Sequence, residues 1–97
     1  MEIELRDYTI HPGCMSAWLT GWRAHILPLR EQAGYRVSGA WVDPDHDRFI
    51  WVLSYDGIDG FDAADDRYHE LPTRLALDPE PSDLIKLAQK VRVVSAM

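Results

Sequence analysis

Hydrophobic and polar positions alternate with a period of two at the start of the chain. Over residues 2–10, Ile3 and Leu5 fall on one parity, and Tyr8 and Ile10 fall on the other. Successive side chains of a strand point to opposite faces of a sheet, so this period predicts a strand.

The next segment changes to a helical period. Apolar side chains recur at steps of three and four over residues 14–33, which places them along one helical face. Gly34 is the expected C-terminal cap of this helix. Pro28 lies inside it and removes a backbone hydrogen bond to Ala24, so we expect a kink or a local break.

Two stretches rich in β-formers, residues 35–42 and 48–55, flank the polar sequence DPDHD and predict an antiparallel hairpin. The second stretch, RFIWVLSY, is apolar on both parities. An antiparallel sheet with one solvated face would show alternation, so both faces of this strand should be covered. So small a domain has helices for one face only, and we expect a second subunit on the other.

The C-terminal part predicts a broken helix followed by a strand. Asp59 is the expected cap of a helix whose apolar side carries Phe61, Ala64, Tyr68 and Leu71. A new turn should begin at Pro72, and another helical turn should lie over residues 82–87. Alternation over residues 90–95 predicts the last strand.

The predicted order is βαββαβ within one domain covering residues 1–97. Two βαβ halves joined by a central hairpin give a four-stranded antiparallel sheet with helices on one face. This is the ferredoxin-like arrangement of the α+β class.

Composition and charge narrow the classes of function. Sixteen acidic against ten basic residues give a net charge of −6, and residues 43–83 alone hold twelve acids and three bases. Binding to nucleic acid or to an anionic membrane needs clustered cations, so neither partner is expected. Cys14 is the only cysteine, and no segment resembles a signal peptide or a membrane span, which favours a cytoplasmic protein.

Four segments resemble the NIPSNAP family and its wider dimeric α/β-barrel superfamily. They are ELRDYTIHPG, WRAHILPL, GAWV and WVLSYD, which occur in that order between residues 3 and 77. The resemblance implies a homodimer whose two sheets face each other in a barrel. It does not imply one chemistry, because the superfamily includes oxygenases, isomerases, haem-degrading enzymes and noncatalytic binders.

Three polar residues are candidates for anchoring a small molecule. Arg6 and Tyr8 share one face of the first strand and have the chemistry to hold a carboxylate or enolate oxygen, as the resemblance also suggests. An ion pair at a dimer interface is the competing interpretation. His25 borders the helical apolar stripe and is the candidate catalytic base, with a structural or solvated histidine as the alternative.

Aromatic residues are the other candidates for ligand binding, although aromatic side chains at such positions often belong to a core or an interface. The candidates are Trp18, Trp22, Trp41, Trp51 and Tyr55. The acidic loop at Asp43–Asp47 fails the EF-hand pattern, because Arg48 and Ser54 stand where glycine and glutamate are required. We therefore expect no metal site, and the sequence contains no motif for an organic cofactor.

These features favour a homodimer that binds a small apolar or aromatic molecule between the first helix and the sheet. One alternative is a cofactor-independent monooxygenase or isomerase acting on a phenolic or polyketide-like substrate, with His25 as base. The other is a noncatalytic interaction domain. A pocket large enough for a ring system would support the first two, and a solidly packed interior would support the third.

Overall fold

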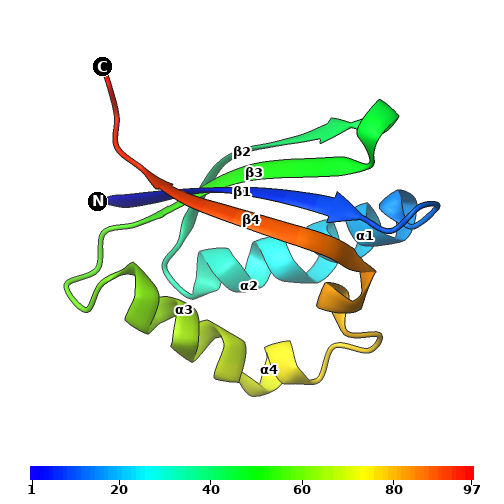
Figure 1. Cartoon of the computed structure of the whole chain (residues 1–97). Helices are drawn as coiled ribbons and strands as arrows, with labels where there is room; N and C mark the ends of the chain where they lie inside the picture. The colour runs from blue at the N-terminus through cyan, green and yellow to red at the C-terminus, as the bar shows by residue number, and fades with distance from the viewer.

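All helices lie on one face of a four-stranded antiparallel sheet in the computed structural model, which describes residues 1–97 (Figure 1). The order of the strands across the sheet is β2-β3-β1-β4. Their bounds are β1 Glu2–Ile10, β2 Arg36–Asp43, β3 Arg48–Tyr55 and β4 Ile85–Val93. This order confirms the predicted ferredoxin-like fold, with β1 and β3 in the centre.

The first helical segment contains the predicted break. It consists of α1 (Met15–Gly21), a π-helical turn (Trp22–Ile26) and α2 (Leu27–Gln32). Pro28 has no N–H to donate to Ala24, and the turn before it widens so that the Leu27 N–H bonds the Trp22 carbonyl. Gly34 ends the segment with φ of 95°, as expected for a left-handed cap.

The second helical segment begins differently from the prediction. In place of Asp59, Gly60 is the N-cap of α3 (Phe61–Glu70), and the Glu2 carboxylate accepts the Phe61 N–H. Asp59 instead accepts a hydrogen bond from the Tyr55 hydroxyl at 2.7 Å. The short α4 (Pro72–Leu75) begins at the proline, as predicted.

The last strand begins earlier than predicted. A 3₁₀ turn occupies Pro81–Leu84, and β4 starts at Ile85, so the helical turn expected over residues 82–87 is wrong in its second half. Pairing with β1 is the reason, because Ile85 pairs with Ile10 and residues 87–90 pair with residues 9–6, with a register shift at Lys86. Long-range pairing of this kind overrides a weak local preference.

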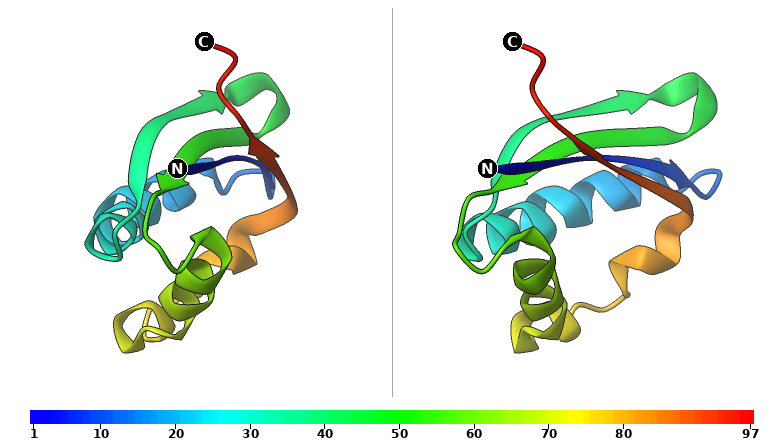
Figure 2. Two further views of the ribbon diagram at one scale, coloured as in Figure 1. Left: turned by 90° about the vertical axis from the view of Figure 1, so that its left-hand side faces the viewer. Right: turned by 60° about the vertical axis from the view of Figure 1, so that its left-hand side comes forward.

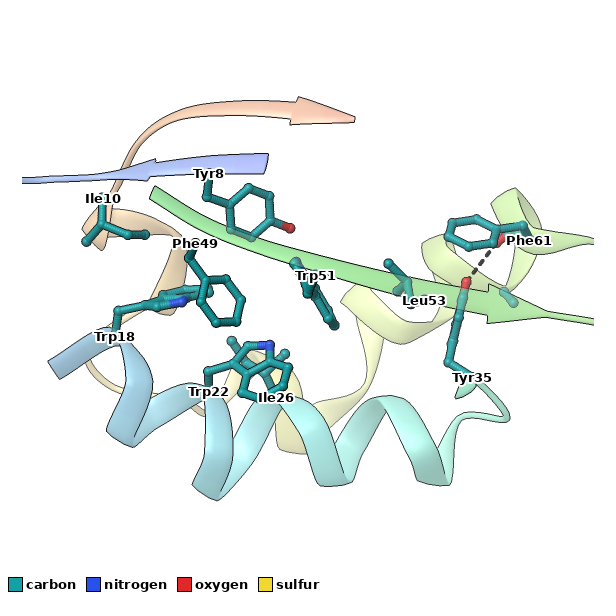
Figure 3. Close-up of a cluster of buried hydrophobic side chains, with 11 residues drawn as sticks. Tyr8, Ile10, Trp18, Trp22, Ile26, Tyr35, Phe49, Trp51, Leu53 and Phe61 are labelled. Carbon is teal, nitrogen blue, oxygen red and sulfur yellow. Dashed lines mark hydrogen bonds between the residues drawn. The ribbon is translucent and has the colours of Figure 1, made fainter. Parts of the chain in front are cut away.

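Aromatic side chains fill the core between the sheet and the first helical segment (Figure 3). Phe49 and Trp51 point down from β3 towards Trp18 and Trp22. The Trp22 and Trp51 rings meet edge to face, with centroids 5.5 Å apart at 88°. Such contacts add to the large apolar area that each ring buries.

No helix covers the other face of the sheet, which we call the open face (Figure 2). Its large side chains are partly or strongly exposed, with Trp41, Leu87 and Val91 at 56%, 55% and 53%. Strand registry puts these residues on the same face as Ile50 and Val52, the second apolar parity of β3. Its other apolar members are Ile3, Leu5 and Val93, and its polar members include Asp7, Thr9, Arg48 and Gln89.

Candidate functional site

A cavity of about 300 Å³ lies on the helix side of the sheet, beside β1 and the edge strand β4. Four of the residues singled out from the sequence line it: Arg6, Tyr8, Trp18 and Trp51. The helices contribute further polar walls, chiefly Arg30, Tyr68 and Arg74. The cavity therefore combines aromatic surfaces with several cationic groups.

Arg6 reaches the cavity because every second residue of β1 faces the helices. It is buried, and its Nε donates to Glu4 at 2.8 Å. Its remaining nitrogens donate to the Tyr8 hydroxyl at 3.4 Å and to Asp65 at 3.3 Å. Burial alone would lower the pKa of Arg6, but Tyr8, Asp65 and Glu4 outweigh it and leave the pKa raised, so the group stays cationic.

Arg30 is a site residue that the sequence interpretation missed. It lies in α2, its side chain is 2% exposed, and its Nη1 donates to Asp65 at 2.7 Å. The guanidinium stacks over the Tyr68 ring, 3.7 Å from the centroid. A signal was present, because Trp22, Ile26 and Arg30 are spaced by four and so share the buried helical face.

Asp65, on α3, joins the two buried arginines. Burial raises the pKa of its carboxyl, but the hydrogen bond and charge of Arg30, together with the charge of Arg6, outweigh burial and lower the pKa. The carboxylate is therefore ionised at neutral pH. Its hydrogen bonds connect α3 to β1, 59 residues earlier in the chain, and to α2, 35 residues earlier.

Tyr68 and Arg74 form the wall opposite β1. Tyr68 is 2% exposed, and its hydroxyl has no hydrogen-bond partner. Burial raises the pKa of Tyr68, so it is a neutral phenol at pH 7. Arg74 donates to both oxygens of Glu80, at 3.0 and 2.7 Å, and this pairing lowers the pKa of Glu80 to about 2.

Two lysines of β4 and one neutral histidine complete the polar lining. Lys90 stands opposite Arg6 in the ladder, and both it and Lys86 are exposed without an ion-pair partner. His69 lies beside Tyr68, and burial lowers its pKa, which keeps the imidazole neutral at pH 7.

The structure places His25 away from this cavity. We expected it to face the space between helix and sheet, but it is exposed and lines a separate hollow of about 640 Å³ on the outer side of α1. The π-helical turn that contains His25 carries Trp22 and Ile26 inward and leaves His25 outside. Trp18 touches both spaces, whereas Trp22 lines only the outer hollow.

Two other predicted aromatic residues also lie elsewhere. Trp41 is on the open face, where its ring covers Gly39 of the same strand. Tyr55 is half-buried at the far end of β3, stacked on Tyr35 at 5.0 Å. In the acidic loop, the Asp43 carboxylate pairs with His46 Nδ1 at 2.9 Å. No group of three or more side chains that could hold a metal ion occurs in the structure.

The model of the NIPSNAP family matches residues 3–96 of the chain. The chain belongs to the NIPSNAP family. The match confirms the resemblance and extends it beyond residue 77, through β4.

Solved structures place this NIPSNAP chain among proteins of the same fold. An uncharacterized NIPSNAP domain protein from Burkholderia xenovorans is 22% identical, with a TM-score of 0.84 over 99% of this chain and 95% of that one. A NIPSNAP family protein from Agrobacterium tumefaciens is 20% identical, with a TM-score of 0.86 over 97% and 84%. No curated protein matches the chain.

The fold of this NIPSNAP protein is also found outside the family. A protein described as an antibiotic biosynthesis monooxygenase is 15% identical, with a TM-score of 0.72 over the full length of both chains. At that identity the likeness shows the fold alone. None of the helices here has the length and apolar character needed to cross a bilayer.

Proposed function

We propose that this protein binds a small ring-containing molecule in the cavity beside β4. The observation that carries the proposal is a space of about 300 Å³ walled by Tyr8, Trp18 and Trp51, with Arg6 as a polar anchor. Small-molecule sites have volumes from about 300 Å³ upward, with mostly apolar walls and few polar groups. Aromatic walls suit a flat ring, because offset and edge-to-face contacts are favourable.

Filling the cavity should remove this binding. Ala88 lines the cavity from the exposed strand β4, so Ala88→Trp would place a bulky side chain there without deleting core contacts. We expect 2-naphthamide, a neutral two-ring probe, to bind the natural protein and to lose at least about tenfold in affinity in this variant. Titration calorimetry measures the effect.

The control for the cavity test is Ala63→Trp, the same change at an exposed position of α3 outside the cavity. It should bind the probe as the natural protein does, and both variants should keep the melting temperature within a few degrees. Equal affinity in Ala88→Trp and Ala63→Trp would show that the probe binds elsewhere.

We further propose that the protein is a homodimer formed through the open face. Exposed large apolar side chains on one sheet face indicate an interaction surface, and Leu5 pairs with Val91 on this face. A two-fold axis lets one such patch cover its own copy. The family relationship supports the same assembly.

A charge on the open face should dissociate the dimer. We expect sedimentation equilibrium at micromolar concentration to give about twice the chain mass of 11.1 kDa, and Val91→Glu to give a folded monomer. Ile58→Glu makes the same change in a fully exposed loop and should stay dimeric. A monomeric natural protein would contradict the proposal that a second copy of the chain covers the open face.

The enzymatic alternative has less support than binding. Its proposed base, His25, is exposed on the outer side of α1 and does not line the cavity with Arg6 and Tyr8. The alternative of a purely structural interaction domain required an interior packed solid by aromatic rings. The cavity favours a binding protein over the structural domain, and the position of His25 outside the cavity favours it over the enzyme.

A further inference from the structure

Unpaired hydrogen-bond donors gather around the cavity. Six buried side-chain polar atoms of the chain lack a partner, and five of them belong to residues that line this one space. They are the indole nitrogens of Trp18 and Trp51, the Nε atoms of Arg30 and Arg74, and the Tyr68 hydroxyl. All five residues are more than nine-tenths buried. Buried donors without acceptors are rare in folded proteins, and the residues that carry five of the six line this one space.

The formally charged side chains that line the cavity are all positive. Arginine and lysine are the only formally charged residues that line it, and they number five: Arg6, Arg30, Arg74, Lys86 and Lys90. Three carboxylates that do not line the cavity pair with the arginines, namely Glu4, Asp65 and Glu80. The two lysines have no such partner. This surplus of positive charge occurs in a chain whose net charge is −6, so it is not a reflection of overall composition.

Two of these cations contact the ring of Tyr68. Arg30 lies flat on Tyr68 at 3.7 Å from its centroid, and Arg74 approaches the same ring at 6.0 Å. Both guanidinium groups therefore lie against Tyr68, whose buried hydroxyl makes no hydrogen bond. Lys90 is the ladder partner of Arg6 on the edge strand β4, and its exposed ammonium group is accessible to a ligand.

We propose that the natural ligand is an aromatic acid, whose ring lies against Trp18 and Trp51 and whose carboxylate is held by Tyr68, Arg30 and Arg74. This inference rests on the proposed binding function and specifies its ligand. A carboxylate has only acceptors to offer, which matches a set of groups that are all donors. A single carboxylate on a small ring system also suits the volume of about 300 Å³.

The test compares two probes of nearly the same shape, 2-naphthoate and its neutral amide, 2-naphthamide. At pH 7 and low salt we expect the natural protein to prefer the naphthoate by about tenfold or more, with the preference falling as salt screens the charges. Tyr68→Phe removes only the hydroxyl, and Lys90→Gln removes only an exposed charge. Each should reduce the preference by about threefold or more, because the naphthoate loses more affinity than the amide when a donor or a positive charge is removed.

The charge-matched control is Arg23→Gln, which removes an exposed cation outside the cavity and should keep the preference. Equal binding of both probes by the natural protein would overturn the acid proposal and leave the binding function intact. Binding of neither probe would overturn both. A preference that persists in Tyr68→Phe and Lys90→Gln, each with an unchanged melting temperature, would overturn the assigned carboxylate position.

Discussion

Trp51→Asp is expected to abolish the cooperative unfolding transition of this protein. Trp51 is 1% exposed and packs edge to face on Trp22 and Tyr8. The substitution removes an indole, which costs about 3–5 kcal/mol when truncated in a core, and buries an unpaired carboxylate as well. Together these effects approach the whole stability of a domain of this size, about 5–15 kcal/mol. Calorimetry and near-ultraviolet circular dichroism measure the loss.

Trp41→Asp is the matched control for this prediction. Trp41 lies on β2, on the opposite side of the sheet, and is strongly exposed. The control should keep a cooperative melting transition, because no core contact is lost. If Trp51→Asp melted cooperatively near the temperature of the natural protein, the aromatic layer between β3 and α1 would not hold the domain together.

Asp65→Asn is expected to lower the free energy of unfolding by about 3 kcal/mol, the usual scale for removing one partner of a buried ion pair. The asparagine side chain is nearly isosteric, so packing is preserved and the charge alone is removed. Arg30, whose side chain is 2% exposed, would lose the only carboxylate that pairs with it. Arg6 would lose one of its two carboxylate partners.

Urea denaturation at pH 7 measures this loss, and the melting temperature should fall by about 10 °C or more for a domain of 97 residues. Asp66→Asn is the control, because the neighbouring carboxylate is exposed and makes no ion pair. Its effect should stay within about 0.5 kcal/mol. Equal stability of the two variants would mean that the charge of Asp65 does not stabilise the buried arginines.

The periodic parts of the chain were predictable because packing against one layer of helices imposes a regular pattern. Alternation over residues 2–10 and the apolar run of β3 coincide with the observed strands. Helix caps were less predictable, since the group that caps α3 is Glu2, 59 residues away. The start of β4 at Ile85 likewise depends on a ladder with β1 that no local window contains.

The site was predictable only where it coincided with a strand face. Arg6, Tyr8 and Trp51 were found because alternation aims them to one side of the sheet. Arg30 and Tyr68 belong to the same cavity, but their importance depends on contacts between α2 and α3 that chain spacing does not reveal. His25 was misplaced because a π-helical turn departs from the regular helical spacing used to orient it.

The position of β4 at the rim of the sheet has a consequence for solubility. One side of its backbone meets no neighbour, and the amide and carbonyl groups that point away from β1 along this nine-residue strand form a template on which another strand can add. Lys86 and Lys90, which make no ion pair, are spaced along this rim. Their like charges repel the same rim of a second molecule, so residues near the ligand's entrance also protect the protein from edge-to-edge aggregation.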